Sequence, residues 1–198
     1  MGKLINGEWK VRSIITSNDS GAYDRLPRTF LDTISKKDKL FQPESKRYHL
    51  YVSYACPWAC RTLIYRKLKQ LDNHISVSVV HPDMLEDGWM FDSSFPGATE
   101  DHLYGKKFLR QIYQKADSKV TTSVTVPVLW DKKTETIVNN ESSEIIRIFN
   151  SSFNELTNNY EDFYPMSKRQ EIEKMNQLVY ESVNNGVYKS GFAQTQQA

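Results

Sequence analysis

The amino-acid sequence predicts an α/β domain followed by a helical segment. The 198 residues are 39% hydrophobic and 12% aromatic, which is enough for a packed core. The pattern of residues 48–80 predicts strand, helix and strand, a crossover that most often forms a right-handed parallel unit. Residues 125–149 predict two more strands and a helix. The sequence then becomes polar over residues 150–166 before one further amphipathic helix begins.

The first strand and the helix that follows it carry the clearest local signals. Residues 48–54 are dense in aromatic and β-branched side chains, as is typical of a strand. Pro57 suits the first position of a helix, because its missing N–H would have no partner there. Apolar residues at helical spacing predict that this helix extends over residues 58–71. Residues 75–80 predict the second strand.

Four further elements are expected in the rest of the domain. Residues 103–116 predict a short amphipathic helix. The strands at 125–131 and 136–138 flank a polar turn and predict an antiparallel hairpin. Pro127, near the start of its strand, requires either an edge position or a special peptide bond. Asparagines and early acidic residues predict a helix over 139–149.

The first 45 residues show no sustained periodicity. They hold polar residues with scattered glycines and prolines, which indicates an irregular lead segment. We expect Trp9, Tyr23 and Phe30 to pack this segment onto the domain.

The end of the sequence predicts a linker and one helix of a second domain. Residues 150–166 are rich in Asn, Ser and Thr and form the expected linker. Ser167, with Gln170 three residues later, matches a capping box at a helix start. An apolar stripe follows, made of Ile172, Met175, Val179 and Val183. A single amphipathic helix cannot bury its own stripe, so we expect this second domain, residues 151–198, to be incomplete.

Charge and composition argue against several functional classes. The 26 basic and 24 acidic residues are spread without a basic block, so no nucleic-acid partner is expected. No apolar run approaches the ~20 residues of a membrane span, and the first residues lack a signal-peptide pattern. We therefore expect a cytoplasmic protein without a membrane partner. Four scattered histidines and two cysteines give no zinc-site spacing, so no metal is expected.

Cys56 is the candidate nucleophile. Cysteine reacts as the thiolate, and its ordinary pKa is near ~8.5. The unpaired amides and dipole of a helix N-terminus favour an anion, and Cys56 precedes Pro57 at such a position. The alternative is that Cys56 is an inert buried residue. Cys60 lies on the same helix face as Cys56, but the spacing is not that of a Cys-x-x-Cys redox pair, so we favour no redox role for Cys60. The alternative that Cys60 traps oxidised Cys56 stays open.

Five separated blocks occur in the order of one known family. They are Cys56-Pro57-Trp58-Ala59 with Arg61, residues 86–89, 124–131, 137–146 and 184–189. The sequence resembles the glutathionyl-hydroquinone reductases, also called xi-class glutathione transferases, which include fungal omega-like transferases. The resemblance implies a thioredoxin-like, glutathione-binding domain over residues 46–150. It also implies that residues 151–198 begin an all-α glutathione-transferase C-terminal domain.

The resemblance implies a glutathione-dependent transferase or reductase with Cys56 as the catalytic thiol. Cys56 would attack the sulfur of a glutathionyl adduct, which gives a mixed disulfide that a second glutathione resolves. Tyr188 matches a tyrosine that helps to bind or protonate the quinol oxygen. The expected partners are glutathione as co-substrate and small aromatic or disulfide substrates, with no metal. A homodimer is left open.

The resemblance also implies five glutathione-binding residues. Trp89 would lie against glutathione. Val126, before a cis-proline at Pro127, would pair its backbone with the cysteinyl part of the tripeptide. Glu141 and Ser142 would hold the γ-glutamyl end, in keeping with the preference of a carboxylate for hydroxyl and amide donors at a helix N-terminus.

Two departures from the family pattern keep alternatives open. Cys60 stands where the family typically has His, and Ser123 stands where it usually has Arg, an expected contact to a glutathione carboxylate. Losing a guanidinium weakens anion recognition unless Lys119 or another cation substitutes. The alternatives are a glutaredoxin-like thioltransferase or dehydroascorbate reductase, and an inactive glutathione-binding fragment.

Overall fold

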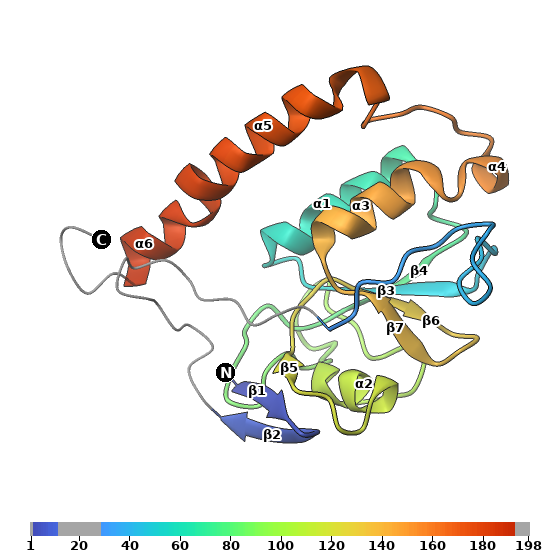
Figure 1. The fold of residues 1–198 in the computed structure, drawn as a ribbon. Coiled ribbons are helices and arrows are strands. Elements are labelled where there is room, and N and C mark those ends of the chain that lie inside the picture. The colour runs from blue at the N-terminus through green and yellow to red at the C-terminus, as the bar shows by residue number, and fades with distance from the viewer. Residues whose placement is uncertain (1, 12–28, 193–198) are drawn as a thin grey trace. The chain divides into compact units, whose positions relative to one another are not determined.

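The computed structural model describes residues 2–11 and 29–192, which divide into two compact units (Figure 1). Residues 2–11 and 29–161 form the first unit, and residues 162–192 belong to the second. The predicted boundary after residue 150 differs from this division. The reason is a buried lysine, Lys69, whose Nζ donates to the carbonyl oxygens of Asn159 and Glu161 at 3.0 and 2.5 Å and thereby holds this segment on the first unit.

A mixed four-stranded sheet forms the centre of the first unit. Its order is β4 (Ser76–Val79), β3 (Tyr48–Val52), β6 (Val128–Asp131) and β7 (Thr136–Asn139). β3 and β4 are parallel and are joined by α1 (Pro57–Leu68), as the strand–helix–strand pattern predicts. β3 and β6, and then β6 and β7, pair antiparallel, which confirms the predicted hairpin.

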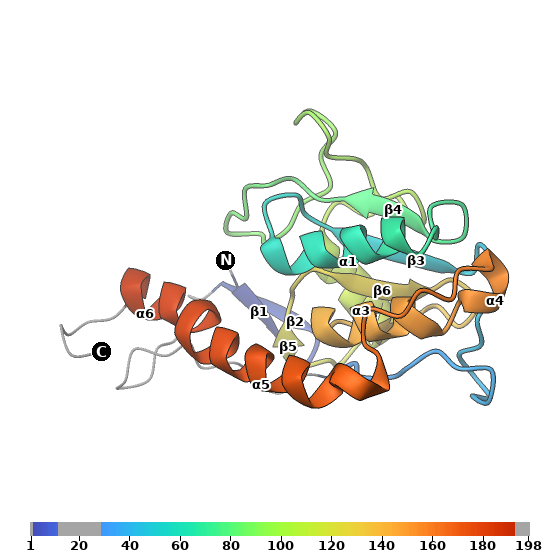
Figure 2. The same cartoon turned by 90° about the horizontal axis from the view of Figure 1, so that it is seen from above.

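Helices cover both faces of this sheet (Figures 1 and 2). α1 and α3 (Ser142–Ser151) lie side by side on one face, and α2 (Leu109–Ala116) lies on the other. All five residues of β3 are buried because the strand is covered on both sides. α3 ends before a short helix, α4 (Asn154–Thr157). The α/β fold class is therefore confirmed.

α2 begins six residues later than predicted because Asp101 binds the backbone before it. This carboxylate is buried and accepts hydrogen bonds from the amides of Leu103, Tyr104 and Lys106 at 3.1, 3.2 and 3.0 Å. Those amides are thereby used in a turn around the side chain and not in a helix.

Residues 2–11, which we predicted to be irregular, form a hairpin. β1 (Gly2–Ile5) and β2 (Glu8–Val11) pair antiparallel around Asn6 and Gly7, whose φ angles are 49° and 78°. Positive φ at both central residues is what a tight hairpin turn of this kind requires, and Asn-Gly supplies it. β5 (Thr122–Ser123) adds to β1 as a third strand. The irregular prediction is therefore wrong for residues 2–11.

Trp9 packs as predicted and fixes the loop before α2. A Cβ atom on Gly88 would lie 3.0 Å from the Trp9 ring, so the glycine allows the close approach. The indole Nε1 donates to the Glu86 carbonyl oxygen at 3.1 Å. The Arg110 guanidinium lies 5.2 Å from the centre of the same ring and pairs with Asp87 at 3.0 Å. The hairpin thus holds the loop that carries Trp89.

Phe30 also packs on the first unit as predicted. Its ring meets Tyr113 edge to face, with centroids 5.9 Å apart. Tyr23, the third residue expected to pack there, lies outside the described residues.

The second unit is a run of helical segments. A 3₁₀ turn (Met166–Lys168) leads into α5 (Arg169–Val179), a π-helical turn (Tyr180–Asn184) and α6 (Gly186–Phe192). The capping-box prediction at Ser167 is wrong, because this residue lies inside the 3₁₀ turn that follows Pro165 and no side chain caps α5. Met175 and Val183 of the predicted stripe are 58% and 59% exposed.

A buried ion pair joins the start of β3 to the end of β6. Arg47 donates to both carboxylate oxygens of Asp131, from Nε at 2.7 Å and from Nη2 at 2.5 Å. Both side chains are almost fully buried. Burial by itself would raise the pKa of Asp131, but the hydrogen bonds from Arg47 and from the Thr134 hydroxyl outweigh it and hold that pKa below its ordinary value.

Replacing Asp131 with Asn should lower the free energy of unfolding by about 3 kcal/mol, because it removes the buried carboxylate and leaves the Arg47 charge paired only with the partly exposed Glu44. Urea denaturation at neutral pH measures the difference. In the unmodified chain the lowered pKa means that this stabilisation is present above the ordinary aspartate pKa and is lost as pH falls through the folded value.

Glu135→Gln is the matched control, since it breaks an exposed pair with Lys115 and should change stability little. An Asp131→Asn chain as stable as this control would contradict the assigned role of the buried pair.

Candidate active site

Cys56 lies at the N-terminus of α1, as predicted. It is the N-cap residue, with extended backbone angles of φ −101° and ψ 114°, and Pro57 occupies the first helical position. Its amide donates to the Ser53 carbonyl oxygen at 3.1 Å, and its own carbonyl oxygen accepts from the Cys60 amide at 3.0 Å. The turn after β3 and the first helical turn together fix where this residue stands.

Burial controls the protonation of the Cys56 thiol. Its Sγ lies 3.7 Å from the Val126 carbonyl oxygen, to which the S–H donates. Burial raises the pKa of this thiol above its ordinary value, although hydrogen bonds from the Ala59 and Trp58 amides and the charge of Arg61 act in the opposite direction. The helix amides thus favour the thiolate, as the sequence leads one to expect, but desolvation of the charge has the larger effect on the pKa of this thiol in the protein without ligand.

The segment opposite the thiol contains the special peptide bond that Pro127 required. The Val126–Pro127 bond is cis, and both side chains are buried. The Val126 carbonyl oxygen meets the thiol. Within the described ranges 2–11 and 29–192, nothing accepts a hydrogen bond from the Val126 amide. This stretch of backbone therefore keeps a donor available for an added strand.

Glu141 and Ser142 stand at the N-terminus of α3. Glu141 is the N-cap residue, and its Oε1 accepts from the Ser143 amide at 3.2 Å. The Asn139 side-chain oxygen accepts from the Glu141 amide at 2.8 Å and fixes the entry to the helix. Ser142 is only 3% exposed, so its hydroxyl is held in place. A carboxylate, hydroxyls and a helix N-terminus meet here, as the sequence predicts.

Arg61 joins the two helix N-termini. Its Nε and Nη2 donate to the Ser142 Oγ at 3.0 and 2.6 Å, and Nη2 lies 3.8 Å from the Glu141 carboxylate. Because Arg61 is on α1, this contact brings the helix of Cys56 and the start of α3 together, consistent with their arrangement in Figure 2. From the sequence alone Arg61 had no assigned role. Its position one turn after Cys56 is the one local signal, because the partner, Ser142, lies 81 residues away.

The other predicted residues lie farther from these contacts. Trp89 is half-buried, and its carbonyl oxygen accepts from the Leu109 amide at 2.9 Å; no contact among the described residues joins it to Cys56. Tyr188 is on α6, in the second unit, so its role stays a prediction. Ser123 lies in β5 directly opposite Lys3. Ser123 stands where the family usually has Arg, and Lys3 is a cation beside this position that the sequence alone did not indicate. Lys119, the substitute considered from the sequence, is exposed on the preceding turn.

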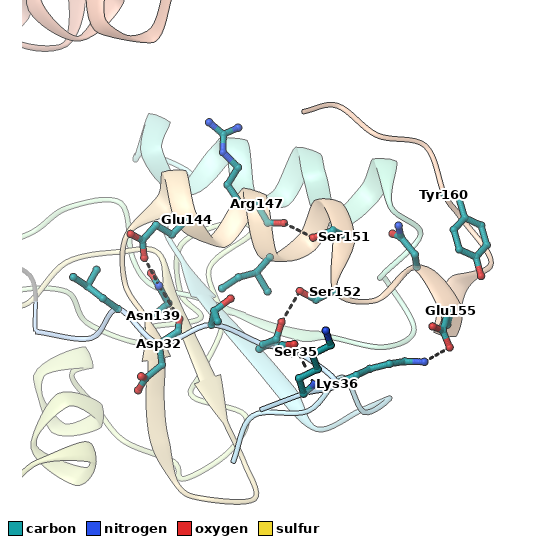
Figure 3. Close-up of a pocket in the computed structure, with 16 residues that line it drawn as sticks. Asp32, Ser35, Lys36, Asn139, Glu144, Arg147, Ser151, Ser152, Glu155 and Tyr160 are labelled. Atoms are coloured by element: carbon teal, nitrogen blue, oxygen red, sulfur yellow. Dashed lines mark hydrogen bonds and ion pairs between the residues drawn. The ribbon is translucent and has the colours of Figure 1, made fainter. Parts of the chain in front are cut away.

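A separate pocket of about 870 Å³ lies along the outer side of α3 and α4 (Figure 3). Its wall includes residues 31–37, and Lys36 forms an ion pair with Glu155 at one side of it. None of the predicted catalytic or glutathione-binding residues lines this pocket.

No group of three His, Cys, Asp or Glu side chains in the described part of the chain could hold a metal ion. No helix within the same residues is long and apolar enough to cross a membrane.

Comparison with protein families and known proteins gives one consistent result. Residues 55–152 match the model of the glutathione S-transferase N-terminal domain. The glutathionyl-hydroquinone reductase YqjG of Escherichia coli is 51% identical over 205 residues, covering 100% of this chain and 62% of the relative.

Solved structures give the same result. The xi glutathione S-transferase of Phanerochaete chrysosporium matches with a TM-score of 0.88 and 49% identity, over 95% of this chain and 62% of that one. The glutathione-bound structure of YqjG matches with a TM-score of 0.86 and 48% identity, over 99% and 60%. The chain thus spans about 60% of the length of these relatives. It belongs to the glutathione transferase family, and its close homologues are xi-class transferases and glutathionyl-hydroquinone reductases.

Proposed function

We propose that this protein is a glutathione-dependent thiol transferase or reductase that uses Cys56 to remove glutathione from glutathionyl-hydroquinone-type substrates. The observation that carries the proposal is the placement of the Cys56 Sγ. It lies at a helix N-terminus, 3.7 Å from the carbonyl oxygen of Val126, whose amide stays available. The same end of the unit presents Glu141, Ser142 and Arg61.

The reaction follows from thiol–disulfide chemistry. The Cys56 thiolate attacks the sulfur of the glutathionyl adduct, the bond between that sulfur and the aromatic carbon breaks, and the aromatic product takes up a proton. A protein–glutathione disulfide results. The thiolate of a second glutathione then attacks the glutathionyl sulfur, which releases glutathione disulfide and regenerates Cys56. In this scheme Tyr188 is the residue that binds or protonates the quinol oxygen.

The binding of glutathione uses two ready-made features of the backbone. Val126 offers its amide, so the cysteinyl part of the tripeptide can pair with it as an added strand. In the proposed mode of binding, the amides at the N-terminus of α3 donate to the γ-glutamyl carboxylate of glutathione. The Glu141 carboxylate pairs with the ammonium group of the same γ-glutamyl residue. Trp89 and Pro127 complete the proposed set. The glutathione-bound structure of the E. coli relative supports glutathione as the ligand.

A second candidate is a glutaredoxin-like thioltransferase that acts on small disulfides or dehydroascorbate. The exposed Cys60, one turn from Cys56, favours it. Turnover of a model mixed disulfide without turnover of a glutathionyl-hydroquinone would select this candidate. Glutathione binding without any turnover would identify a binding module instead.

Replacing Cys56 with Ser should abolish the rapid covalent attachment of glutathione, because the hydroxyl is not nucleophilic toward sulfur at neutral pH. In a time course of intact mass with glutathione disulfide, the Cys60→Ser chain, which retains Cys56, should acquire one glutathionyl group much faster than Cys56→Ser, whose remaining thiol, Cys60, is exposed. Labelling of Cys56→Ser at the same rate would remove the assignment of the nucleophile.

The alkylation rate of Cys56 should report a pKa above that of free cysteine, since burial raises it. In a Cys60→Ser chain, iodoacetamide labelling should be slow at neutral pH and rise about tenfold per pH unit until the thiol ionises. A model cysteine peptide, with its pKa near ~8.5, provides the reference. A midpoint below that reference would mean that the helix amides outweigh burial.

Replacing Glu141 with Gln should weaken glutathione binding with little loss of stability. Glutamine keeps an oxygen for the Ser143 amide but removes the charge that faces the ammonium. Losing a charged hydrogen bond of about 1.5–3 kcal/mol raises the dissociation constant roughly tenfold to hundredfold. Isothermal titration with glutathione measures it, with thermal unfolding as the control. Unchanged affinity would place the γ-glutamyl end elsewhere.

A further inference from the structure

Cys60 lies one helical turn after Cys56 and is tied to it through the backbone. The Cys60 amide donates to the Cys56 carbonyl oxygen at 3.0 Å, the first hydrogen bond of α1. Side chains on a helix lean toward its N-terminus, so the side chain of Cys60 leans toward the turn that begins at Cys56. Two residues four apart inside a helix have Cβ atoms about 5–6 Å apart, and Cys56 stands at the edge of this geometry because its own backbone angles are extended.

This separation is close to what a disulfide requires. A disulfide needs Cβ atoms about 3.5–4.5 Å apart, so the two residues must approach by roughly 1–2 Å. The hydrogen bonds of the Cys56 amide to Ser53 and of its carbonyl oxygen to Cys60 hold its backbone, so the approach falls mainly to the side chains. The Cys56 side chain must leave the Val126 carbonyl oxygen to reach Cys60.

Packing does not explain Cys60. Ala59 and Thr62, its neighbours on α1, are fully buried, whereas Cys60 is exposed. Within the described part of the chain its side chain has no hydrogen-bond partner. An exposed thiol beside a nucleophilic thiol is accessible to whatever reaches the first one. The two groups also act on each other, since a charge on Cys60 raises the pKa of Cys56.

We propose that Cys60 is a resolving thiol, which makes Cys56 and Cys60 a two-cysteine redox site. The proposal rests on the proposed function, since Cys56 must first carry glutathione. The Cys60 thiolate then attacks the Cys56 sulfur, and a Cys56–Cys60 bond forms. The bond from Cys56 to the glutathionyl sulfur breaks, and glutathione leaves as a thiolate that takes up a proton.

The electrons balance over the whole sequence. With glutathione disulfide as the oxidant, the two protein thiols lose two electrons and become one disulfide, and the oxidant becomes two molecules of glutathione. With a glutathionyl adduct as substrate, the first glutathione is released without a second one attacking the mixed disulfide. The ligand class is then any glutathione-linked disulfide or thioether that reaches Cys56, and the protein returns to its thiol form only after a separate reduction.

The test compares the reduced chain with Cys60→Ser after incubation with excess glutathione disulfide and an acid quench. The unmodified chain should lose two hydrogens and carry no glutathione, while Cys60→Ser should hold one glutathionyl group. Trypsin cleaves after Arg47 and Arg61, so both cysteines lie in the single peptide 48–61. That peptide should also lack two hydrogens, which distinguishes an internal disulfide from one between chains.

The outcomes separate the inference from the function on which it rests. If the unmodified chain keeps its glutathionyl group as fully as Cys60→Ser does, the inference is overturned and the proposed function stands. If Cys60→Ser acquires no glutathionyl group, both are overturned. Circular dichroism verifies that Cys60→Ser is folded, which its exposed position favours.

Discussion

The contact from Arg61 to Ser142 is the interaction on which the site depends. It joins α1, which carries the thiol, to the start of α3, which carries the carboxylate and hydroxyls. Both helices pack on the same face of a sheet whose strands are held together by the buried Arg47–Asp131 pair. Because each helix presents its N-terminus, donors for two negative groups are fixed before any ligand arrives.

The second constraint is the competition between burial and the helix amides at Cys56. Burial is the larger effect and raises the pKa of this thiol, whose S–H donates to the Val126 carbonyl oxygen. A ligand that brings positive charge or pairs with the Val126 backbone alters this balance where it binds. The N-terminal hairpin contributes at a distance, since Trp9 packs on Gly88 and steadies the loop of Trp89.

Local signals predicted most of the elements, and what they missed has both local and long-range causes. The parallel unit around α1 and the helix start at Cys56 depend on neighbouring residues, so the pattern gave them directly. Asn6-Gly7 is an equally local hairpin signal that the lack of periodicity in the lead segment obscured. The start of α2 depends on the carboxylate of Asp101, which binds amides two to five residues later, so this turn is also a local signal. The role of Arg61, in contrast, depends on Ser142, 81 residues away, and this partner cannot be read from the sequence alone.

The most direct measurement is a crystal structure of the Cys60→Ser chain trapped as its glutathione mixed disulfide. We expect the glutathionyl sulfur to be bonded to Cys56 and the Val126 amide to donate to the tripeptide backbone. We also expect the γ-glutamyl carboxylate at the first amides of α3, with the ammonium of the same end facing Glu141. Glutathione bonded to Cys56 but directed away from Val126 and α3 would contradict the proposed mode of binding.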